Sequence, residues 1–150
     1  MRVVIQRVTK SYVGINGKES ACIGPGLMVL AGFEEDDISQ EIIWMAKKIA
    51  NLRIFDNIAG VMNKSILESN GDILIISQFT LHAKTKKGNR PSYIQAAPPE
   101  IAIPLYEQFI VAMEKELCKP VKAGVFGAHM KVSLVNDGPV TIIIDTKNKE

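Results

Sequence analysis

Three short segments carry polar residues or glycines at positions where a chain built only for packing would not require them. These segments are Ser77–Leu81, Gly124–Met130 and Asn136–Pro139. The first follows a run of Ile and Leu, and it contains Ser77, Gln78, Phe79 and Thr80. Sites are often built at strand ends, so these hydroxyl and amide groups are candidates for binding a polar substrate. The hydroxyls of Ser77 and Thr80 could instead satisfy nearby backbone groups at the end of a strand.

The other two segments combine glycine with a bulky or conformationally restricted residue. Two glycines surround Phe126 in the second segment, which indicates either a close approach of the backbone to a ligand or an ordinary turn before a strand. In the third segment, Gly138 precedes Pro139. The residues alone favour a hairpin turn at Asn136–Pro139, because Asn, Asp, Gly and Pro are the usual turn residues.

A cluster of basic residues follows the first segment directly. It consists of Lys84, Lys86, Lys87 and Arg90. In a loop, these side chains could follow a phosphate backbone, and Tyr93 could stack on a base. A solvated loop with scattered charge would have the same composition, so both explanations remain open at this point.

The common catalytic motifs are missing from the sequence. It has no GxSxG, HExxH, P-loop or GxGxxG pattern. A Ser-His-Asp triad can be written from Ser77, one of the two histidines and Asp145, but the spacing of these residues does not favour it. The two histidines are His82 and His129. The sequence therefore indicates either a binding module or an enzyme with unusual chemistry.

The composition is that of a globular domain. The 150 residues are 47% hydrophobic and 23% charged, with a formal net charge of +2. This length is about one domain, so we expect a single domain over residues 1–150. The small net charge argues against a heavily basic nucleic-acid binder, and no apolar run approaches the ~18 residues of a membrane-spanning helix. Cys22 and Cys118 have no zinc-ligand spacing, so we expect reduced thiols, a cytoplasmic location, and neither metal nor cofactor.

Two helices are predicted from apolar residues at helical spacing. The first covers about residues 39–50, with Ser39 as a candidate N-cap. The second begins at Pro99 or Ile103 and ends at Leu117, because Pro104 would kink a helix that began at Pro99.

Strands and turns account for most of the remaining chain. Apolar alternation or continuous apolar runs predict strands at residues 3–8, 27–31, 73–79, 130–135 and 140–145. Asn16-Gly17 is a strong hairpin signal, and the polar, proline-rich stretch 83–99 is expected to be a loop. The hairpin-type links favour an α/β (α+β-like) fold with a mostly antiparallel sheet and two main helices.

Two of the three segments resemble motifs of a known family. SQFTL at Ser77–Leu81 and NDGPVT at Asn136–Thr141 are similar to motifs of the D-aminoacyl-tRNA deacylases. Further matches follow in the same order along the chain: MRVVIQRV (1–8), LRIF (52–55), KKGNRPSY (86–93), AAPPE (96–100) and FGAHM (126–130). Each match alone is weak, but the whole series is specific, and the chain is identified as a member of this family.

The resemblance implies a fold, an activity and a partner. Members of the family have their own β-rich fold with a barrel-like core, are cytoplasmic homodimers and use no cofactor. They hydrolyse the ester between a D-amino acid and the 3′-terminal adenosine of tRNA, and they also remove glycine from mischarged tRNA. We therefore expect the same activity here, with D-aminoacyl-tRNA as substrate and a second copy of the chain as partner.

The resemblance also implies roles for particular residues. Gly138 and Pro139 match a cis Gly-Pro selector that one subunit inserts into the pocket of the other, where it rejects L-amino acids. Arg7 matches an arginine that braces the selector; the alternative is an ordinary charge on a strand surface. Residues of the adenine pocket correspond to Phe126 and Met130. The pocket floor, whose backbone N–H groups would stabilise the oxyanion, corresponds to Ser77, Gln78, Phe79 and Thr80.

The resemblance leaves two candidates for the attacking group. Thr80 is an obvious nucleophile candidate, but a threonine hydroxyl without a base is weak. We therefore prefer attack by water, assisted by the 2′-hydroxyl of the terminal ribose. The alternatives are an esterase that uses Ser77 or Thr80 and a non-catalytic tRNA-binding module. The chain departs from the family at His82, where Tyr is frequent, and at Asn89, where a basic residue is common; His82 leaves open a local base for Thr80.

Overall fold

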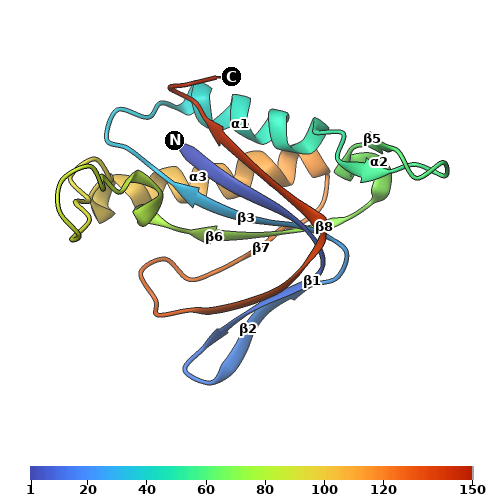
Figure 1. Ribbon diagram of the computed structural model, residues 1–150, viewed down its shortest axis with the longest axis horizontal. Coiled ribbons are helices and arrows are strands. Elements are labelled where there is room, and N and C mark those ends of the chain that lie inside the picture. Colours follow the sequence, from blue (N-terminus) through green and yellow to red (C-terminus); the bar gives the residue numbers. More distant parts are fainter. Residues whose placement is uncertain (150) are drawn as a thin grey trace.

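The computed structural model describes residues 1–149, and its centre is a strongly bent, six-stranded mixed sheet (Figure 1). The strands are β1 (Arg2–Ile15), β2 (Lys18–Ile23), β3 (Gly26–Gly32), β6 (Asp72–Ser77), β7 (Lys122–Ala123) and β8 (Lys131–Asp145). The order is β2-β1-β3-β6-β7, and β8, which is outside this path, also pairs with β1. Strand β1 is antiparallel to β2, β3 and β8, whereas β6 is parallel to both β3 and β7. The predicted α/β class with a barrel-like core is confirmed.

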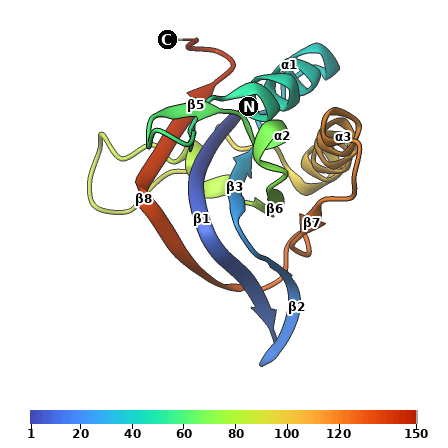
Figure 2. The same cartoon turned by 90° about the vertical axis from the view of Figure 1, so that its right-hand side faces the viewer.

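Two long helices cover one side of this sheet, side by side (Figure 2). They are α1 (Ser39–Asn51) and α3 (Pro99–Leu117). Helix α1 forms because Ile42, Met45 and Ile49 share a face that is fully buried in the core. Its cap position is occupied by Ile38, one residue earlier than expected, and the Glu41 carboxylate accepts the Ile38 N–H at 3.2 Å.

Smaller elements link these layers. They are the two-stranded sheet of β4 (Phe55–Asp56) and β5 (Met62–Lys64), the short helix α2 (Ile66–Ser69) and the 3-10 helix η1 (Phe79–His82). The core between the sheet and the long helices contains Phe33, whose ring meets Tyr106 and Phe109 edge-on, with both ring centroids 6.5 Å away. No helix within residues 1–149 is long and apolar enough to cross a membrane.

The structure decides between the two predicted starts of one helix, and one strand ends earlier than predicted. Helix α3 begins at Pro99 and continues through Pro104. A proline at this position leaves the Glu100 carbonyl without its helical donor, and Glu100 lies on the exposed side, where water can replace that donor. Strand β6 ends at Ser77, so Phe79 belongs to η1 and not to the strand as predicted.

The predicted hairpin turn at Asn136–Pro139 is wrong, because both halves of the segment belong to one strand, β8, that pairs with β1 throughout. Gln6 pairs with Thr141 and Val8 with Asn136, so β8 has four residues between these pairs where β1 has one. The extra residues, 137–140, form a bulge opposite Arg7. Asn, Asp, Gly and Pro suit a bulge as well as a hairpin turn, so the residue types alone do not distinguish the two.

The N-terminal ammonium of Met1 and the carboxylate of Asp37 form an ion pair, and the side chains of both residues are fully buried. The same ammonium donates to Thr146 Oγ1 at 2.7 Å, and Asp37 Oδ2 accepts the Glu34 N–H at 2.7 Å. Asp37→Ala therefore leaves a buried charge without its partner and is expected to lower the free energy of unfolding by about 3–5 kcal/mol in chemical denaturation.

Asp36→Ala is the matched control for this change. Its carboxylate is 79% exposed and lies 3.5 Å from Lys147 Nζ, so its removal should change the free energy of unfolding by less than about 1 kcal/mol. Equal losses in the two variants would contradict the role of the buried pair.

Candidate active site

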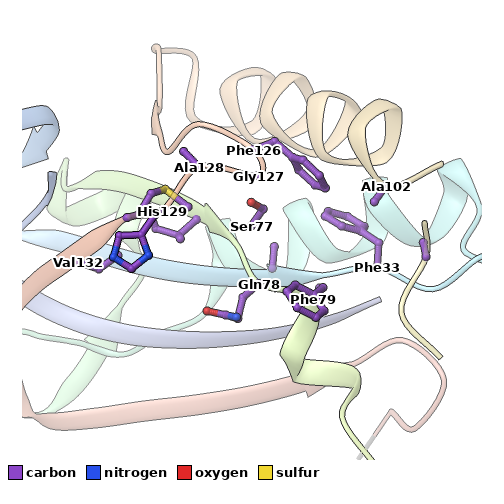
Figure 3. Close-up of a pocket in the computed structure, with 15 residues that line it drawn as sticks. Phe33, Ser77, Gln78, Phe79, Ala102, Phe126, Gly127, Ala128, His129 and Val132 are labelled. Atoms are coloured by element: carbon purple, nitrogen blue, oxygen red, sulfur yellow. The ribbon is translucent and has the colours of Figure 1, made fainter. Parts of the chain in front are cut away.

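A cavity of about 260 Å³ lies at the carboxyl ends of β3 and β6 (Figure 3). These strands are parallel, and the carboxyl ends of parallel strands are the usual place for ligand crevices. Gly32 and Phe33 line the cavity from the β3 side, Ser77 and Gln78 from the β6 side, and the segment 126–130 closes it. The cavity therefore joins two of the three segments singled out in the sequence.

The floor of the cavity is the point where β6 changes into η1. The Gln78 N–H donates to the Ala31 carbonyl at 2.7 Å, which is the last link between β6 and β3. Phe79 and Thr80 are the first residues of η1, and the first N–H groups of a helix have no acceptor inside it. These two N–H groups therefore have no acceptor within η1, and Phe79 is one of the residues that line the cavity.

The Thr80 hydroxyl is engaged by its own neighbour. The Gln78 side-chain amide donates to Thr80 Oγ1 at 2.5 Å. Thr80 does not line the cavity, whereas the ring of Phe79 does and is 54% exposed. Phe79 meets Tyr93 edge-on with ring centroids 5.0 Å apart, so the loop after η1 rests against the mouth of the site.

An aromatic wall stands on the side of the cavity toward α3. In Figure 3 the rings of Phe33 and Phe126 lie together below this helix. The ring of Phe126 is tilted against that of Tyr106, with centroids 5.9 Å apart. The Tyr106 hydroxyl lies 3.0 Å from the Ile75 carbonyl oxygen and 3.1 Å from that of Gly124. Burial raises the pKa of Tyr106 to about 12, so this hydroxyl stays protonated at neutral pH and can donate to them.

Met130 is held against the base of the same wall. A Cβ atom on Gly124 would lie 2.6 Å from the Met130 sulfur and 3.0 Å from Ile76 Cδ1. Glycine at this position therefore lets the thioether pack directly on the backbone. The sequence left open an approach of the backbone to a ligand or an ordinary turn; at Gly124 the approaching group is the chain's own Met130 side chain.

The bulge of β8 lies outside this cavity and is built around Arg7. Arg7 is 6% exposed; its Nη1 donates to the Ile54 carbonyl at 2.7 Å and its Nε to the Asp137 carbonyl at 3.1 Å. Gly138 has φ +128°, a conformation that favours glycine, and a Cβ there would lie 2.8 Å from Val140 Cγ2. The Gly138-Pro139 peptide bond is cis. Both residues are exposed, so the bulge presents its backbone to the surroundings.

A family model described as D-Tyr-tRNA(Tyr) deacylase matches residues 4–145. The chain belongs to this family. It is 65% identical to a D-aminoacyl-tRNA deacylase of Bacteroides fragilis (strain YCH46) over 150 residues, which is 100% of both chains. It is 54% identical to the protein of the same name from Flavobacterium johnsoniae, again over 100% of both chains. The family identified from the sequence motifs is confirmed.

Solved structures agree on the fold of this deacylase family member. One is titled "c-Myc DNA Unwinding Element Binding Protein"; it has a TM-score of 0.90 and 40% identity, and the match covers 97% of this chain and 98% of that one. A second, titled as a probable eukaryotic D-amino acid tRNA deacylase, has a TM-score of 0.82 at 20% identity over 95% of this chain and 97% of the other. At this lower identity the second likeness supports the fold.

The deacylase cavity contains five of the predicted site residues. They are Ser77, Gln78, Phe79, Phe126 and Met130. Thr80 lies next to the cavity, whereas Arg7, Gly138 and Pro139 form the separate bulge on β8. Arg7 is nearly buried, so it is not the ordinary surface charge that was its alternative explanation. The catalytic and binding roles of all nine residues stay predictions.

The triad written from the sequence is not assembled. Asp145 accepts hydrogen bonds from Arg2, at 2.7 Å from Nη2 and 2.9 Å from Nε, and it does not line the deacylase cavity. His82 is buried and its Nδ1 faces Glu34, not Thr80. A base at His82 for Thr80 therefore has no geometric support.

Two further groups of residues were not identified from the sequence. Phe33 lines the cavity because β3 and β6 are parallel neighbours, and hydrophobic periodicity does not reveal which strands pair. The carboxylates of Glu34, Asp36 and Asp37 gather within 4.8 Å. Asp37 already binds the Met1 ammonium and the Glu34 N–H, so this cluster is part of an ion-pair network.

Proposed function

We propose that this protein is a D-aminoacyl-tRNA deacylase that hydrolyses the ester between a D-amino acid, or glycine, and the 3′-terminal adenosine of tRNA. The observation that carries the proposal is the cavity itself. Two segments that match the family's motifs, 77–79 and 126–130, are far apart in sequence and line one pocket, in a chain that matches the family model over residues 4–145.

The two sides of the cavity suit the two parts of such a substrate. Phe126 offers a flat face for the terminal adenine, and the polarizable sulfur of Met130 packs favourably against an aromatic ring. The N–H groups of Phe79 and Thr80 would receive the oxyanion that forms when the ester carbonyl is attacked. Preorganised backbone donors of this kind stabilise a tetrahedral intermediate because they need no reorganisation during the reaction.

Handedness would be read by the bulge on β8 of a second subunit. In this proposal Gly138 and Pro139 of one protomer enter the pocket of the other, where their carbonyl oxygens receive the α-ammonium group and fill the space that an L side chain needs. A D side chain would point away from the wedge. Selection of this kind works by exclusion of the wrong substrate, and it is supported by the exposure of the bulge and by its attachment to the nearly buried Arg7.

The surface of β8 supports a homodimer. In the sheet, this strand pairs with β1 alone, and its apolar residues Val135 and Ile143 are 45% and 66% exposed. An unpaired strand edge with exposed apolar side chains is a common place for another chain to bind. The homodimer, the cytoplasmic location and the single domain over residues 1–150 stay predictions.

Water is the proposed nucleophile, assisted by the 2′-hydroxyl of the terminal ribose. The Thr80 oxygen already accepts the Gln78 amide, and the nearest histidine in the chain, His82, faces away toward Glu34. A threonine hydroxyl without a base is a poor nucleophile. The role left to the protein is then to orient the ester and stabilise the oxyanion.

The tRNA would be guided by the loop that follows η1. Lys84 and Ser92 bridge its base with two backbone hydrogen bonds of 2.8 and 3.0 Å. Lys86, Lys87 and Arg90 lie between them and are exposed. Since Tyr93 touches Phe79 at the mouth of the cavity, these charges are placed to contact phosphates near the acceptor end, with a binding constant that falls as salt rises.

The experiment that tests the proposal is a paired assay with D-Tyr-tRNA and L-Tyr-tRNA. We expect the wild-type protein to release D-tyrosine and to spare the L-ester. Pro139→Ala, which alters the proposed wedge, should reduce the D-to-L rate ratio by about tenfold or more. Pro120→Ala replaces another exposed proline, outside the cavity, and should leave the ratio unchanged.

The same assay separates the alternatives. A binding module would retain tRNA on a filter without cleaving either ester. An esterase that uses Ser77 or Thr80 would cleave p-nitrophenyl acetate without tRNA and would show little preference for the D-ester. Either result would contradict the proposed function.

A further inference from the structure

His82 is a buried titratable residue for which the proposed mechanism has no use. It ends η1 and is 2% exposed. Its Nδ1 lies 3.4 Å from Glu34 Oε1. Its Nε2 has no hydrogen-bond partner among residues 1–149, and it is the one buried side-chain N or O atom of those residues in this condition. Burying a polar ring costs free energy unless its polar atoms have partners. In His82 only the Nδ1 atom has such a partner, which is Glu34.

The imidazole lies directly beneath the floor of the cavity. A Cβ atom on Gly32 would lie 3.0 Å from His82 Cδ2, 3.2 Å from His82 Nε2 and 2.7 Å from the Gln78 carbonyl oxygen. Gly32 and Gln78 both line the cavity. Glycine at position 32 therefore makes room for the ring and for the backbone that precedes the N–H groups of Phe79 and Thr80.

Glu34 is itself held in place. Its N–H donates to Asp37 Oδ2 at 2.7 Å, and Asp37 is bound to the Met1 ammonium. The side chain of Glu34 is only 18% exposed. Glu34 is thus tied to the buried ion pair through the loop between β3 and α1, and it can serve as an anchor for His82.

A second anchor holds η1 from the side of β1. Arg2 Nη1 donates to the Leu81 carbonyl at 2.6 Å, and Arg2 is paired with Asp145 of β8. Arg2 therefore restrains the chain one residue before His82. The two anchors together determine where η1 lies relative to β3. The Leu81 N–H donates to the Gln78 carbonyl at 3.3 Å, whereas the His82 ring lies beside Gly32, so the two anchors reach the floor of the cavity through different residues.

We propose that the His82–Glu34 pair is a positioning device for the oxyanion-binding N–H groups of Phe79 and Thr80. His82 touches no substrate in this proposal. It acts through Gln78 and Gly32, and its effect falls on the rate of the chemical step more than on tRNA binding. The inference rests on the proposed function for its kinetic readout, but the pair itself can be tested without activity.

The kinetic test compares three variants in D-Tyr-tRNA deacylation. His82→Leu keeps the bulk but removes the contact with Glu34, and it should lower kcat by about 10- to 100-fold, the usual effect of losing a residue that orients a catalytic group, with KM changed less than about threefold. His82→Asn places an amide donor near the former Nδ1 and should recover most of kcat. Glu34→Ala, at a partly exposed position, should reproduce the effect of His82→Leu without placing a new side chain in the core.

The structural test uses the same variants without substrate. Hydrogen exchange at the hydrogen-bonded amides of Leu81 and Ala83 should become faster in His82→Leu and in Glu34→Ala, and should be near the wild-type rate in His82→Asn. Glu35→Ala removes a neighbouring exposed acid and should change neither exchange nor kcat. Because exchange does not depend on turnover, it distinguishes a failure of this inference from a failure of the proposed function.

Three outcomes would overturn the proposal. One is a kcat for Glu34→Ala and His82→Leu within about twofold of wild type. Another is a KM that rises as much as kcat falls, which would indicate a role in binding. The third is a His82→Asn variant no better than His82→Leu, which would show that the ring serves only as packing.

Discussion

A tRNA with D-tyrosine on a 2′-deoxy terminal adenosine should remain acylated in the presence of this protein, whereas Thr80→Ala should retain most of its activity on ordinary D-Tyr-tRNA. The expected loss with the 2′-deoxy substrate is at least about 100-fold, the usual contribution of a positioned acid–base group. The expected loss in Thr80→Ala is less than about tenfold, because its hydroxyl accepts a hydrogen bond from Gln78 and the nearby His82 faces Glu34 instead.

Single-turnover deacylation with labelled D-tyrosine measures both effects. Thr80→Val is the matched control, since it keeps the branched shape and removes only the hydroxyl. The 2′-deoxy substrate should still compete with the normal one for the pocket, which would show that binding is intact. If the 2′-deoxy ester were hydrolysed normally and both Thr80 variants were inactive, Thr80 would be the nucleophile.

Arg7→Ala should lower kcat/KM for D-Tyr-tRNA by about 100-fold and reduce the preference for the D-ester, as expected when a binding group moves by about 1 Å. The Arg7 guanidinium joins the Ile54 carbonyl to the Asp137 carbonyl, and it lies 3.3 Å from the Asp56 carboxylate. Its removal leaves the bulge without its support and leaves the Ile54 carbonyl unpaired. The free energy of unfolding should therefore also fall, by about 2–4 kcal/mol.

Two further variants separate these effects. Arg7→Lys keeps the charge, but one ammonium group cannot reproduce a planar fork with several donors, so its D-to-L rate ratio should fall even if it folds stably. Lys10→Ala removes an exposed charge from the same strand and should change neither quantity. An Arg7→Lys protein with full discrimination would contradict the bracing role of Arg7.

Local patterns were sufficient for much of the fold. The apolar face of α1 and the exposed loop around Lys86 follow from periodicity and composition, and both were predicted close to their observed bounds. The bulge at residues 137–140 was not, because a bulge and a hairpin use the same turn residues. In a hairpin the strand after the turn pairs with the strand before it, whereas the residues after this bulge pair with β1, about 130 residues away in sequence.

Local patterns also revealed only part of the candidate site. Ser77 and Gln78 stand out because a buried apolar strand ends there, and Phe126 stands out between glycines. Phe33 gives no such signal, since an apolar residue after a strand is common, and His82 stood out only as a candidate base for Thr80, not as a residue beneath the cavity. Their importance arises from the parallel pairing of β3 with β6, which places Gly32 against Gln78.

Strand β8 begins immediately after Met130, which lines the cavity, and it carries the exposed bulge at residues 137–140. Extended backbone has a repeat of two, so an insertion or deletion of one residue between Val132 and Asn136 would turn every later side chain to the opposite face and move the bulge away from Arg7. The length of this stretch should therefore stay constant among descendants of this gene.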